Sequence, residues 1–217
     1  MTADLFENLD ASAPIREQLA VGAVLLRGFA RPRQHELVAA IQTITAQAPF
    51  RRMFTPGGHQ MSVAMTNCGE VGWITDRSGY RYDAIDPDSG RPWPSMPPLL
   101  RDLAEQAAAE AGFAGFAPDA CLINCYEPGA KMSLHQDRDE RNMGAPIVSV
   151  SLGLPATFLF GGLKRSDKPQ RYRLAHGDVV VWGGPARLAF HGAAPLADGE
   201  HGLLGRRRIN LTFRRAR

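Results

Sequence analysis

The stretch Leu134-His135-Gln136-Asp137 decides how the rest of this chain is interpreted. In a β-strand, residues two apart point to the same face, so the side chains of His135 and Asp137 can meet at one atom. A third partner, His191, lies far along the chain and must come from a different strand or turn. Two histidines and one carboxylate on three adjacent corners of an octahedron form a facial triad that binds Fe(II) and leaves open positions. We therefore expect a metal triad of His135, Asp137 and His191.

A second HxD pattern, His176-Gly177-Asp178, tests this choice. Gly177 interrupts the pattern, and the apolar run Val179-Val180-Val181-Trp182 follows at once. Such an arrangement is typical of a turn that leads into a buried strand. We therefore interpret His176 as structural and His135 as the metal ligand.

From Pro118 onward the chain has a β pattern. Residues 119–126 alternate, so that Leu122, Asn124 and Tyr126 share one face, and the polar side chains there suggest an inward-facing site. Many short strands separated by Gly/Pro turns predict a sandwich or jelly roll. The further strands are expected at residues 147–152, 157–160, 172–174 and 179–182.

The last expected strand, Arg208-Ile209-Asn210-Leu211-Thr212-Phe213-Arg214, alternates polar and apolar residues. An edge strand with one solvated face is the commonest source of such alternation. The alternative is a ligand site, because the Cα atoms of the two arginines lie roughly 20 Å apart and guanidinium groups pair bidentately with carboxylates. Beside a metal triad, this pair suits a small dicarboxylate such as 2-oxoglutarate.

The amino-terminal part of the chain mixes helix, strand and irregular loop. A short buried strand is expected at residues 23–26, and Pro32 is a good first-turn residue for a helix. A second helix is expected from Pro97-Pro98 to a C-cap at Gly112. The apolar face of the first helix is formed by Leu37, Ile41, Ile44 and Ala48.

Between Arg51 and Pro98, glycines, prolines and methionines accompany aromatic residues with arginines among them. Residues 61–66 alternate weakly, as a strand does. Aromatic faces stack on bases and guanidinium groups bind phosphate, so this region suits nucleic-acid binding. On composition alone, a satellite hydrophobic cluster beneath a long loop is favoured. The residues concerned are Trp73, Arg77, Tyr80, Arg81 and Tyr82.

Length and composition set further limits. With 217 residues, 44% of them hydrophobic, the chain is expected to form one sizeable globular unit. The acidic residues 1–7 predict no signal peptide, and no apolar run reaches the ~18 residues of a membrane span. The three cysteines, Cys68, Cys121 and Cys125, are expected as buried or free thiols in a reducing cytoplasm. The net charge of +3 gathers in carboxyl-terminal arginines; it favours polyanions, although a solvated basic tail explains it equally well.

Several motifs together resemble the AlkB family of nucleic-acid dealkylases, which are Fe(II)- and 2-oxoglutarate-dependent dioxygenases. The resemblance extends from about Leu19 to Arg214, and the joint occurrence of HxD, the distal His191 and RxNxxxR makes it specific. The stretches that carry it are 61–69 (MSVAMTNCG), 134–137 (LHQD), 146–154 (PIVSVSLGL), 160–165 (FGGLKR), 176–184 (HGDVVVWGG) and 210–214 (NLTFR).

The resemblance implies a mainly β fold with flanking α-helices. Residues 93–217 would form a double-stranded β-helix (jelly-roll) core, and residues 1–92 an N-terminal extension with an α/β nucleotide-recognition lid. Fe(II) would be held by His135, Asp137 and His191. The co-substrate 2-oxoglutarate would lie against Asn124, Tyr126, Arg208, Asn210 and Arg214. The implied substrate-binding positions are Trp73, Tyr80, Arg81, Tyr82, Asp139 and Arg165.

The implied reaction uses dioxygen to hydroxylate the alkyl group of bases such as 1-methyladenine and 3-methylcytosine, which then lose it as formaldehyde. A methylated nitrogen on the pairing edge is out of reach inside a duplex, so the base must be flipped or single-stranded. The expected partner is alkylated DNA, preferably single-stranded, with RNA as a second candidate. The enzyme is expected to be a cytoplasmic monomer that does not bind membranes.

Two alternatives remain open on the sequence. An oxygenase of the same fold could act on a small molecule or a protein, but the aromatic and arginine pattern around Trp73 and Tyr80 argues against it. A non-catalytic nucleic-acid-binding protein is disfavoured by the intact triad and both strand arginines. Three positions depart from the bacterial pattern of the family: His59 replaces Tyr, Met132 replaces Leu, and Cys125 replaces Arg. Cys125 should not reach the co-substrate, because it lies on the opposite strand face from Asn124.

Overall fold

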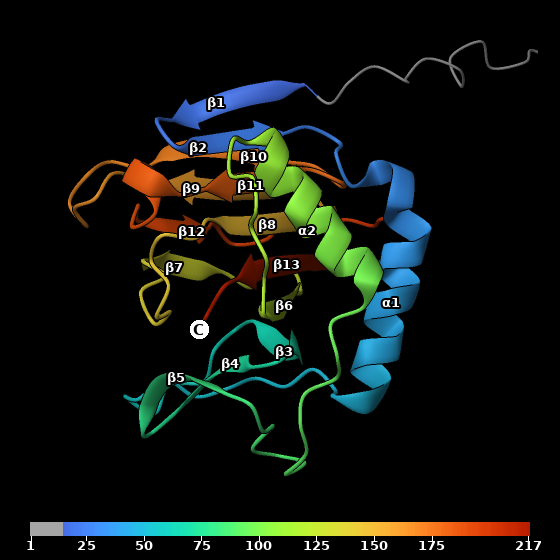
Figure 1. Cartoon of the computed structure of the whole chain (residues 1–217). Coiled ribbons are helices and arrows are strands. Elements are labelled where there is room, and N and C mark those ends of the chain that lie inside the picture. The colour runs from blue at the N-terminus through green and yellow to red at the C-terminus, as the bar shows by residue number, and fades with distance from the viewer. Residues whose placement is uncertain (1–14) are drawn as a thin grey trace, which may run out of the picture.

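The computed structural model describes residues 15–217, and the residues on which the expected absence of a signal peptide rests lie outside them. A seven-stranded sheet with the strand order β1-β2-β11-β8-β13-β6-β3 forms the main layer. A four-stranded sheet, β10-β9-β12-β7, packs against it, and β4 and β5 form a separate hairpin. Strands in the described residues pair antiparallel, as a jelly-roll core requires. The fold is the expected double-stranded β-helix with flanking helices (Figure 1).

The bounds of the strands follow from these pairings. In the seven-stranded sheet they are β1 (Arg16–Ala20), β2 (Ala23–Leu26), β3 (Ala64–Gly69), β6 (Ala120–Tyr126), β8 (Ile147–Gly153), β11 (Val179–Trp182) and β13 (Arg208–Arg214). In the four-stranded sheet they are β7 (Met132–His135), β9 (Ala156–Phe160), β10 (Gln170–Leu174) and β12 (His191–Ala193). The hairpin consists of β4 (Gly72–Asp76) and β5 (Gly79–Asp83).

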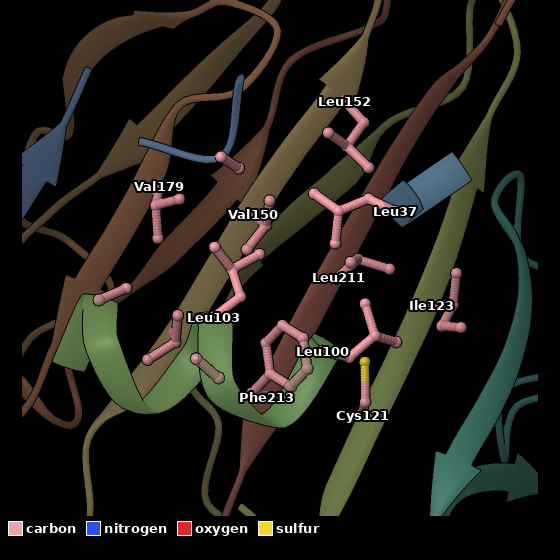
Figure 2. Packing of buried hydrophobic residues seen from close by; sticks show 14 of the residues in the cluster. Leu37, Leu100, Leu103, Cys121, Ile123, Val150, Leu152, Val179, Leu211 and Phe213 are labelled. Atoms are coloured by element: carbon pink, nitrogen blue, oxygen red, sulfur yellow. The ribbon is translucent and has the colours of Figure 1, made fainter. Parts of the chain in front are cut away.

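Two helices cover one face of the seven-stranded sheet (Figure 1). Helix α1 (Gln34–Gln47) follows a single 3-10 turn, η1 (Arg31–Arg33), which contains Pro32. Helix α2 (Pro98–Glu110) is followed by Gly112 at φ +94°, a conformation that glycine adopts without strain. A second 3-10 turn, η2 (Gly184–Ala186), precedes β12. Both expected helices are confirmed, and Leu37, Leu100 and Leu103 pack from them onto the sheet (Figure 2).

Strand β13 contributes one face to the hydrophobic core and the other face to a cavity between the two sheets. It lies between β8 and β6, and all seven of its residues are buried, so the edge-strand alternative is wrong. Ile209 joins the core beneath the helices, together with Leu211 and Phe213 (both labelled in Figure 2). The polar residues of the strand point the other way, into the space between the two sheets; they are Arg208, Asn210, Thr212 and Arg214.

The structure differs from the sequence expectations in the first half of the chain. The strand expected at residues 61–66 lies at 64–69. It includes Asn67, a residue unfavourable in strands, whose side-chain amide donates to the carbonyl of Trp73 and accepts from its N–H. Strands β1, β4 and β5 were not expected. The strands after Pro118 are confirmed to within a few residues at each end.

Residues 15–92 contribute directly to the main layer. Strands β1, β2 and β3 belong to the seven-stranded sheet and α1 to its helix layer, so the expected division at residue 92 does not coincide with a boundary between sheets. Among residues 15–92, only the β4–β5 hairpin forms a sheet of its own. The three cysteines are buried and free, as expected. Within residues 15–217, helices are too short or too polar to cross a membrane.

Candidate active site

The two sheet strands β7 and β12 bring the expected metal ligands together. His135 and His191 face each other across this antiparallel pair. The Nε2 atom of His135 lies 3.6 Å from Oδ1 of Asp137, and Nε2 of His191 lies 3.7 Å from Oδ2. The three ligand atoms all lie within 4.8 Å of one another. One detail of the expectation is wrong: β7 ends at His135, so Asp137 reaches the site from the loop that follows and not from the same strand face.

The protonation of these groups suits a divalent cation. Nδ1 of His135 donates to the carbonyl of Ser133 (2.9 Å) and Nδ1 of His191 to that of Ala189 (3.0 Å), since a carbonyl oxygen can only accept. Each Nε2 lone pair therefore faces the cluster. Burial, reinforced by the neighbouring His135, lowers the pKa of His191 to about 4, so its imidazole is neutral at neutral pH.

The carboxylate of Asp137 is ionised although it is buried. Burial alone would raise its pKa, but Arg214 and then the two histidines outweigh this effect and hold the pKa below its ordinary value. Two imidazoles, each with its Nε2 toward the cluster, and one carboxylate are the donor set of a non-haem Fe(II) site. The residues present therefore fit iron.

A small inner cavity of about 60 Å³ lies beside the triad, between the two sheets. In its wall, Asn124 is paired in register with Asn210 and Tyr126 with Arg208 on the neighbouring strand. The cavity unites all five expected co-substrate residues with two metal ligands. These lining residues are Asn124, Tyr126, Arg208, Asn210, Arg214, His135 and His191.

Arg208 shows what this inner cavity is suited to bind. Its side chain is 3% exposed, its Nη2 donates to Oγ of Ser151 (2.9 Å), and its guanidinium lies 4.9 Å from the ring centroid of Tyr126. Its Nε has no hydrogen-bond partner, and within residues 15–217 no carboxylate forms an ion pair with it. An unpaired buried charge is costly, so a carboxylate ligand such as that of 2-oxoglutarate fits this position.

Arg214, the other arginine of the expected clamp, is engaged differently. Its Nε and Nη2 donate to Oδ2 of Asp137 at 3.0 and 2.7 Å, so it already holds the metal ligand. Asp137 and the nearby acidic groups raise its pKa, which more than offsets the effect of burial. Within residues 15–217, Arg208 is therefore without a carboxylate partner, whereas Arg214 is already paired with the triad; the two-arginine clamp expected from the strand pattern stays a prediction.

A larger outer cavity of about 690 Å³ opens on the other side of the triad. Trp73 and Tyr80 stack in its wall, with ring centroids 5.7 Å apart and planes inclined by 20°. The indole Nε1 of Trp73 donates to Oδ2 of Asp139 (2.9 Å). Arg165 lines the same cavity, and its guanidinium lies 5.9 Å from the ring centroid of Phe190. Four of the six expected substrate-binding residues thus meet in one cavity with His135 and Asp137.

The other two expected substrate residues do not line either cavity. Arg81 pairs with Asp76 on the hairpin at 2.9 Å. The hydroxyl of Tyr82 donates to the buried carboxylate of Glu140 at 2.6 Å. Tyr80 is the residue of β5 that lines the outer cavity, and its neighbour Arg81 points to the opposite face of the strand. Tyr82 shares the strand face of Tyr80, but its side chain is directed to Glu140 and not into the cavity.

Sequence reasoning missed several residues of the outer cavity. Lys131 immediately precedes β7 and Arg138 immediately follows Asp137, and both line the cavity. Cations that flank the metal-binding stretch were the available signal. Thr55, which also lines it, belongs to none of the motifs, whereas Phe190 directly precedes the metal ligand His191, and that position was its available signal.

The remaining positions of interest are also placed by the structure. Met132 lines both cavities, whereas the exposed His59 lines neither. Cys125 belongs to the core beneath the helices, as expected from its strand face. His176 accepts a hydrogen bond from the N–H of Gly153 and contacts Gln34, outside the metal cluster.

A facial His–Asp–His triad beside a cavity for a carboxylate ligand, within a jelly roll, defines an Fe(II)- and 2-oxoglutarate-dependent oxygenase. Comparison with known proteins agrees: the 2OG-Fe(II) oxygenase superfamily matches residues 22–214. Within that class, the chain belongs to the AlkB family of alpha-ketoglutarate-dependent dioxygenases. It is 57% identical over 213 residues to the dioxygenase AlkB of Escherichia coli, covering 98% of this chain and 97% of that protein.

More distant relatives share the fold. The tRNA demethylase abh1 of Schizosaccharomyces pombe is 31% identical over 159 residues, which cover 67% of this chain and 52% of that protein. The solved structure of OsALKBH1 superposes with a TM-score of 0.81 at 29% identity, over 93% of this chain and all of that one. The chain is therefore an iron-dependent dioxygenase that uses 2-oxoglutarate and dioxygen.

Proposed function

We propose that this dioxygenase removes alkyl groups oxidatively from nucleic-acid bases, with 1-methyladenine and 3-methylcytosine in DNA as substrates and RNA as a second one. The observation that carries the proposal is the outer cavity, which joins a stacked Trp73–Tyr80 pair to His135 and Asp137. Aromatic side chains of this kind stack on bases irrespective of sequence. The similarity to the tRNA demethylase abh1 supports a nucleic-acid substrate.

Cationic side chains at the outer cavity suit the phosphate backbone. Lys131, Arg138 and Arg165 line it and can neutralise phosphates on either side of a base held inside. Asp139 lies in the same wall and offers a carboxylate to the positive charge or exocyclic amine of a methylated base. Arg81 and Tyr82 are left outside this role because they do not line the cavity.

The triad would hold Fe(II), and Arg208 with Asn124, Tyr126 and Asn210 would hold 2-oxoglutarate, while Arg214 orients Asp137. When bound, these groups supply the oxidising chemistry that hydroxylates the alkyl carbon. The contribution of the chain is to place that carbon at the end of the outer cavity and to keep water from the inner one. The hydroxylated alkyl group then leaves as formaldehyde and restores the base.

The access route favours an unpaired base. A methyl group on the pairing edge is blocked inside a duplex, so single-stranded nucleic acid avoids the energy of flipping the base.

We assign the recognition role within residues 1–92 to the β4–β5 hairpin and the loop before β3, because these supply Trp73, Tyr80 and Thr55 to the cavity. Free buried thiols suit the cytoplasm, where we place this enzyme as a monomer.

The direct test is to incubate the iron-loaded protein and 2-oxoglutarate with single-stranded oligonucleotides that contain 1-methyladenine or 3-methylcytosine. We expect each lesion to lose the mass of one methylene unit, with matching release of formaldehyde and succinate. Methylated RNA oligonucleotides and duplex DNA measure the preference for each substrate. Formation of succinate without any change in oligonucleotide mass, in DNA and in RNA, would contradict the proposal.

Two variants control for the metal assignment. His135→Ala should abolish turnover and reduce iron occupancy, because it removes one of three ligands. His176→Ala should retain iron, because the His176 ring lies outside the metal cluster. Loss of iron in the second variant but not in the first would exchange the roles of the two HxD motifs.

A further inference from the structure

Behind the triad, four charged side chains are buried in one network. They are the carboxylates of Asp137 and Glu140 and the guanidinium groups of Arg187 and Arg214, each no more than 8% exposed. Two positive and two negative charges make the network neutral. Charges at this depth are costly without partners, so each one fixes the position of its neighbours.

On one side, Glu140 shares a guanidinium with the metal ligand. Nε of Arg214 lies 3.0 Å from Oδ2 of Asp137 and 3.3 Å from Oε1 of Glu140. Both hydrogen bonds from Arg214 to Asp137 go to its Oδ2 atom. The Oδ1 atom, which lies near His135, therefore stays available to a cation. Without the charge of Glu140, the positive charge of Arg214 would act on Asp137 alone and weaken it as a ligand.

On the other side, Glu140 reaches the backbone of the same ligand. Nη2 of Arg187 donates to Oε2 of Glu140 (3.0 Å), and Nη1 donates to the backbone carbonyl of Asp137 (2.7 Å). Nε of Arg187 donates to the carbonyl of Ala145 (3.0 Å). Since Asp137 lies beyond the end of β7, these contacts fix its backbone where strand pairing no longer does.

The network also touches the wall of the outer cavity. Tyr82 on β5 donates its hydroxyl proton to Oε1 of Glu140 at 2.6 Å. The same hairpin carries Trp73 and Tyr80, which line the outer cavity. A movement of the hairpin is therefore transmitted to the carboxylate that shares Arg214 with Asp137.

We infer that Glu140 is a positioning residue for the metal ligand Asp137, acting through Arg214 and Arg187, and that Tyr82 couples it to the β4–β5 hairpin. The inference rests on the iron and 2-oxoglutarate roles of the site and not on the identity of the alkylated substrate. Glu140 does not line either cavity, so it acts without touching substrate or co-substrate.

The test is Glu140→Gln, which keeps the shape of the side chain and removes its negative charge. Fe(II) affinity is measured by anaerobic titration in the presence of 2-oxoglutarate, using the visible charge-transfer absorbance of the chelate. Loss of a group that orients a metal ligand typically costs 10–100-fold in metal affinity or activity. We expect iron binding about tenfold weaker, with a lower kcat for succinate formation without nucleic acid and little change in the KM for 2-oxoglutarate.

Asp178→Asn is the matched control. Asp178 is also a buried carboxylate paired with an arginine, Arg27, at 2.9 Å, but it has no contact with the triad. This variant should lower the Tm and leave iron affinity at the wild-type value. A Glu140→Gln protein with lowered Tm and wild-type iron affinity would show that Glu140 is only structural and would overturn the inference.

Tyr82→Phe provides a second, milder variant that removes one hydroxyl. If Tyr82 acts through Glu140, its effect on iron affinity should largely disappear in the double variant with Glu140→Gln, because coupled residues are not additive. Should Glu140→Gln fail to fold, wild-type iron affinity in Tyr82→Phe would by itself overturn the coupling. Neither readout requires nucleic acid, so failure here is distinguishable from failure of the proposed dealkylation.

Discussion

At the scale of single residues, Arg208 carries a buried charge whose natural counter-ion is the co-substrate. Arg208→Ala should raise the KM for 2-oxoglutarate strongly, since losing one side of a buried charge pair typically costs ~2–5 kcal/mol. The measurement is succinate formation against 2-oxoglutarate concentration, with oligonucleotide affinity expected to change little. Arg206→Ala is the control, because this exposed arginine pairs with Asp198 on the surface. Unchanged dependence on 2-oxoglutarate in Arg208→Ala would remove β13 from the co-substrate site.

Asp139 is the residue expected to distinguish charged from neutral lesions. Its carboxylate lies in the outer cavity and is held by Nε1 of Trp73. A hydrogen bond to a charged group contributes about 1.5–3 kcal/mol, so Asp139→Ala should slow single-turnover demethylation of cationic 3-methylcytosine by at least tenfold. The neutral lesion 3-methylthymine should suffer less. An equal loss on both lesions in Asp139→Ala would mean that this carboxylate does not sense charge.

At the scale of elements, His176 joins the turn before β11 to the start of α1. The N–H of Gly153 donates to its Nδ1 (2.9 Å), and its Nε2 lies 2.8 Å from Oε1 of Gln34, so the neutral ring is required. Burial, then His201 and Arg31, lower its pKa to about 4. Because the folded protein takes up this proton less readily than the unfolded chain, the contribution of His176 to stability is complete above about pH 6.5 and is lost as the pH falls toward 4.

This pH dependence is measurable by chemical denaturation. The free energy of unfolding should fall between pH 6.5 and about pH 4, and the fall should be shallower in His176→Gln, which lacks the titrating group. Comparing the two proteins at each pH cancels the carboxylates that titrate in the same range. Parallel curves for the two proteins would contradict the assignment.

Elements with a complete periodic pattern were the ones the sequence could predict. Helices α1 and α2 and strands β6, β8, β11 and β13 have an apolar period and a Gly or Pro boundary, and the structure confirms them. The polar face of β13 predicts both an edge strand and a ligand site, and only the position of β8 and β6 on either side decides between them. The hairpin strands β4 and β5 are short and have no clear apolar period, so their pairing depends on tertiary contacts such as that of Asn67 with Trp73.

At the scale of the whole molecule, the sequence identified the ligands but not the residues that support them. His135, Asp137 and His191 follow from donor type and spacing, and the structure brings them together. Arg187 and Glu140 belong to no motif, and their contact depends on the packing of η2 against the loop after β7. The role of Arg214 as a partner of Asp137 likewise needed the two sheets to be placed face to face.

The active site joins the two sheets, and this has a consequence for stability. The histidine ligands come from β7 and β12 of the four-stranded sheet, whereas Arg208 and Asn124 come from β13 and β6 of the seven-stranded one. Ligands that bind only the folded state stabilise it by about 2.7 kcal/mol at one hundred times their Kd. For a chain of this size, this corresponds to a rise in Tm of roughly 5–10 °C.

We therefore expect metal and 2-oxoglutarate together to raise the Tm above that of the metal-free protein, and a chelator to reverse the rise. The measurement is anaerobic thermal unfolding with Fe(II), or with Mn(II) as a substitute that does not turn over. Arg208→Ala should keep the shift caused by metal and lose the part added by 2-oxoglutarate, because only the second ligand needs the guanidinium. His135→Ala should lose both, since the remaining two ligands hold the metal weakly. If 2-oxoglutarate stabilised Arg208→Ala as much as the wild type, the co-substrate would not bridge the two sheets through β13.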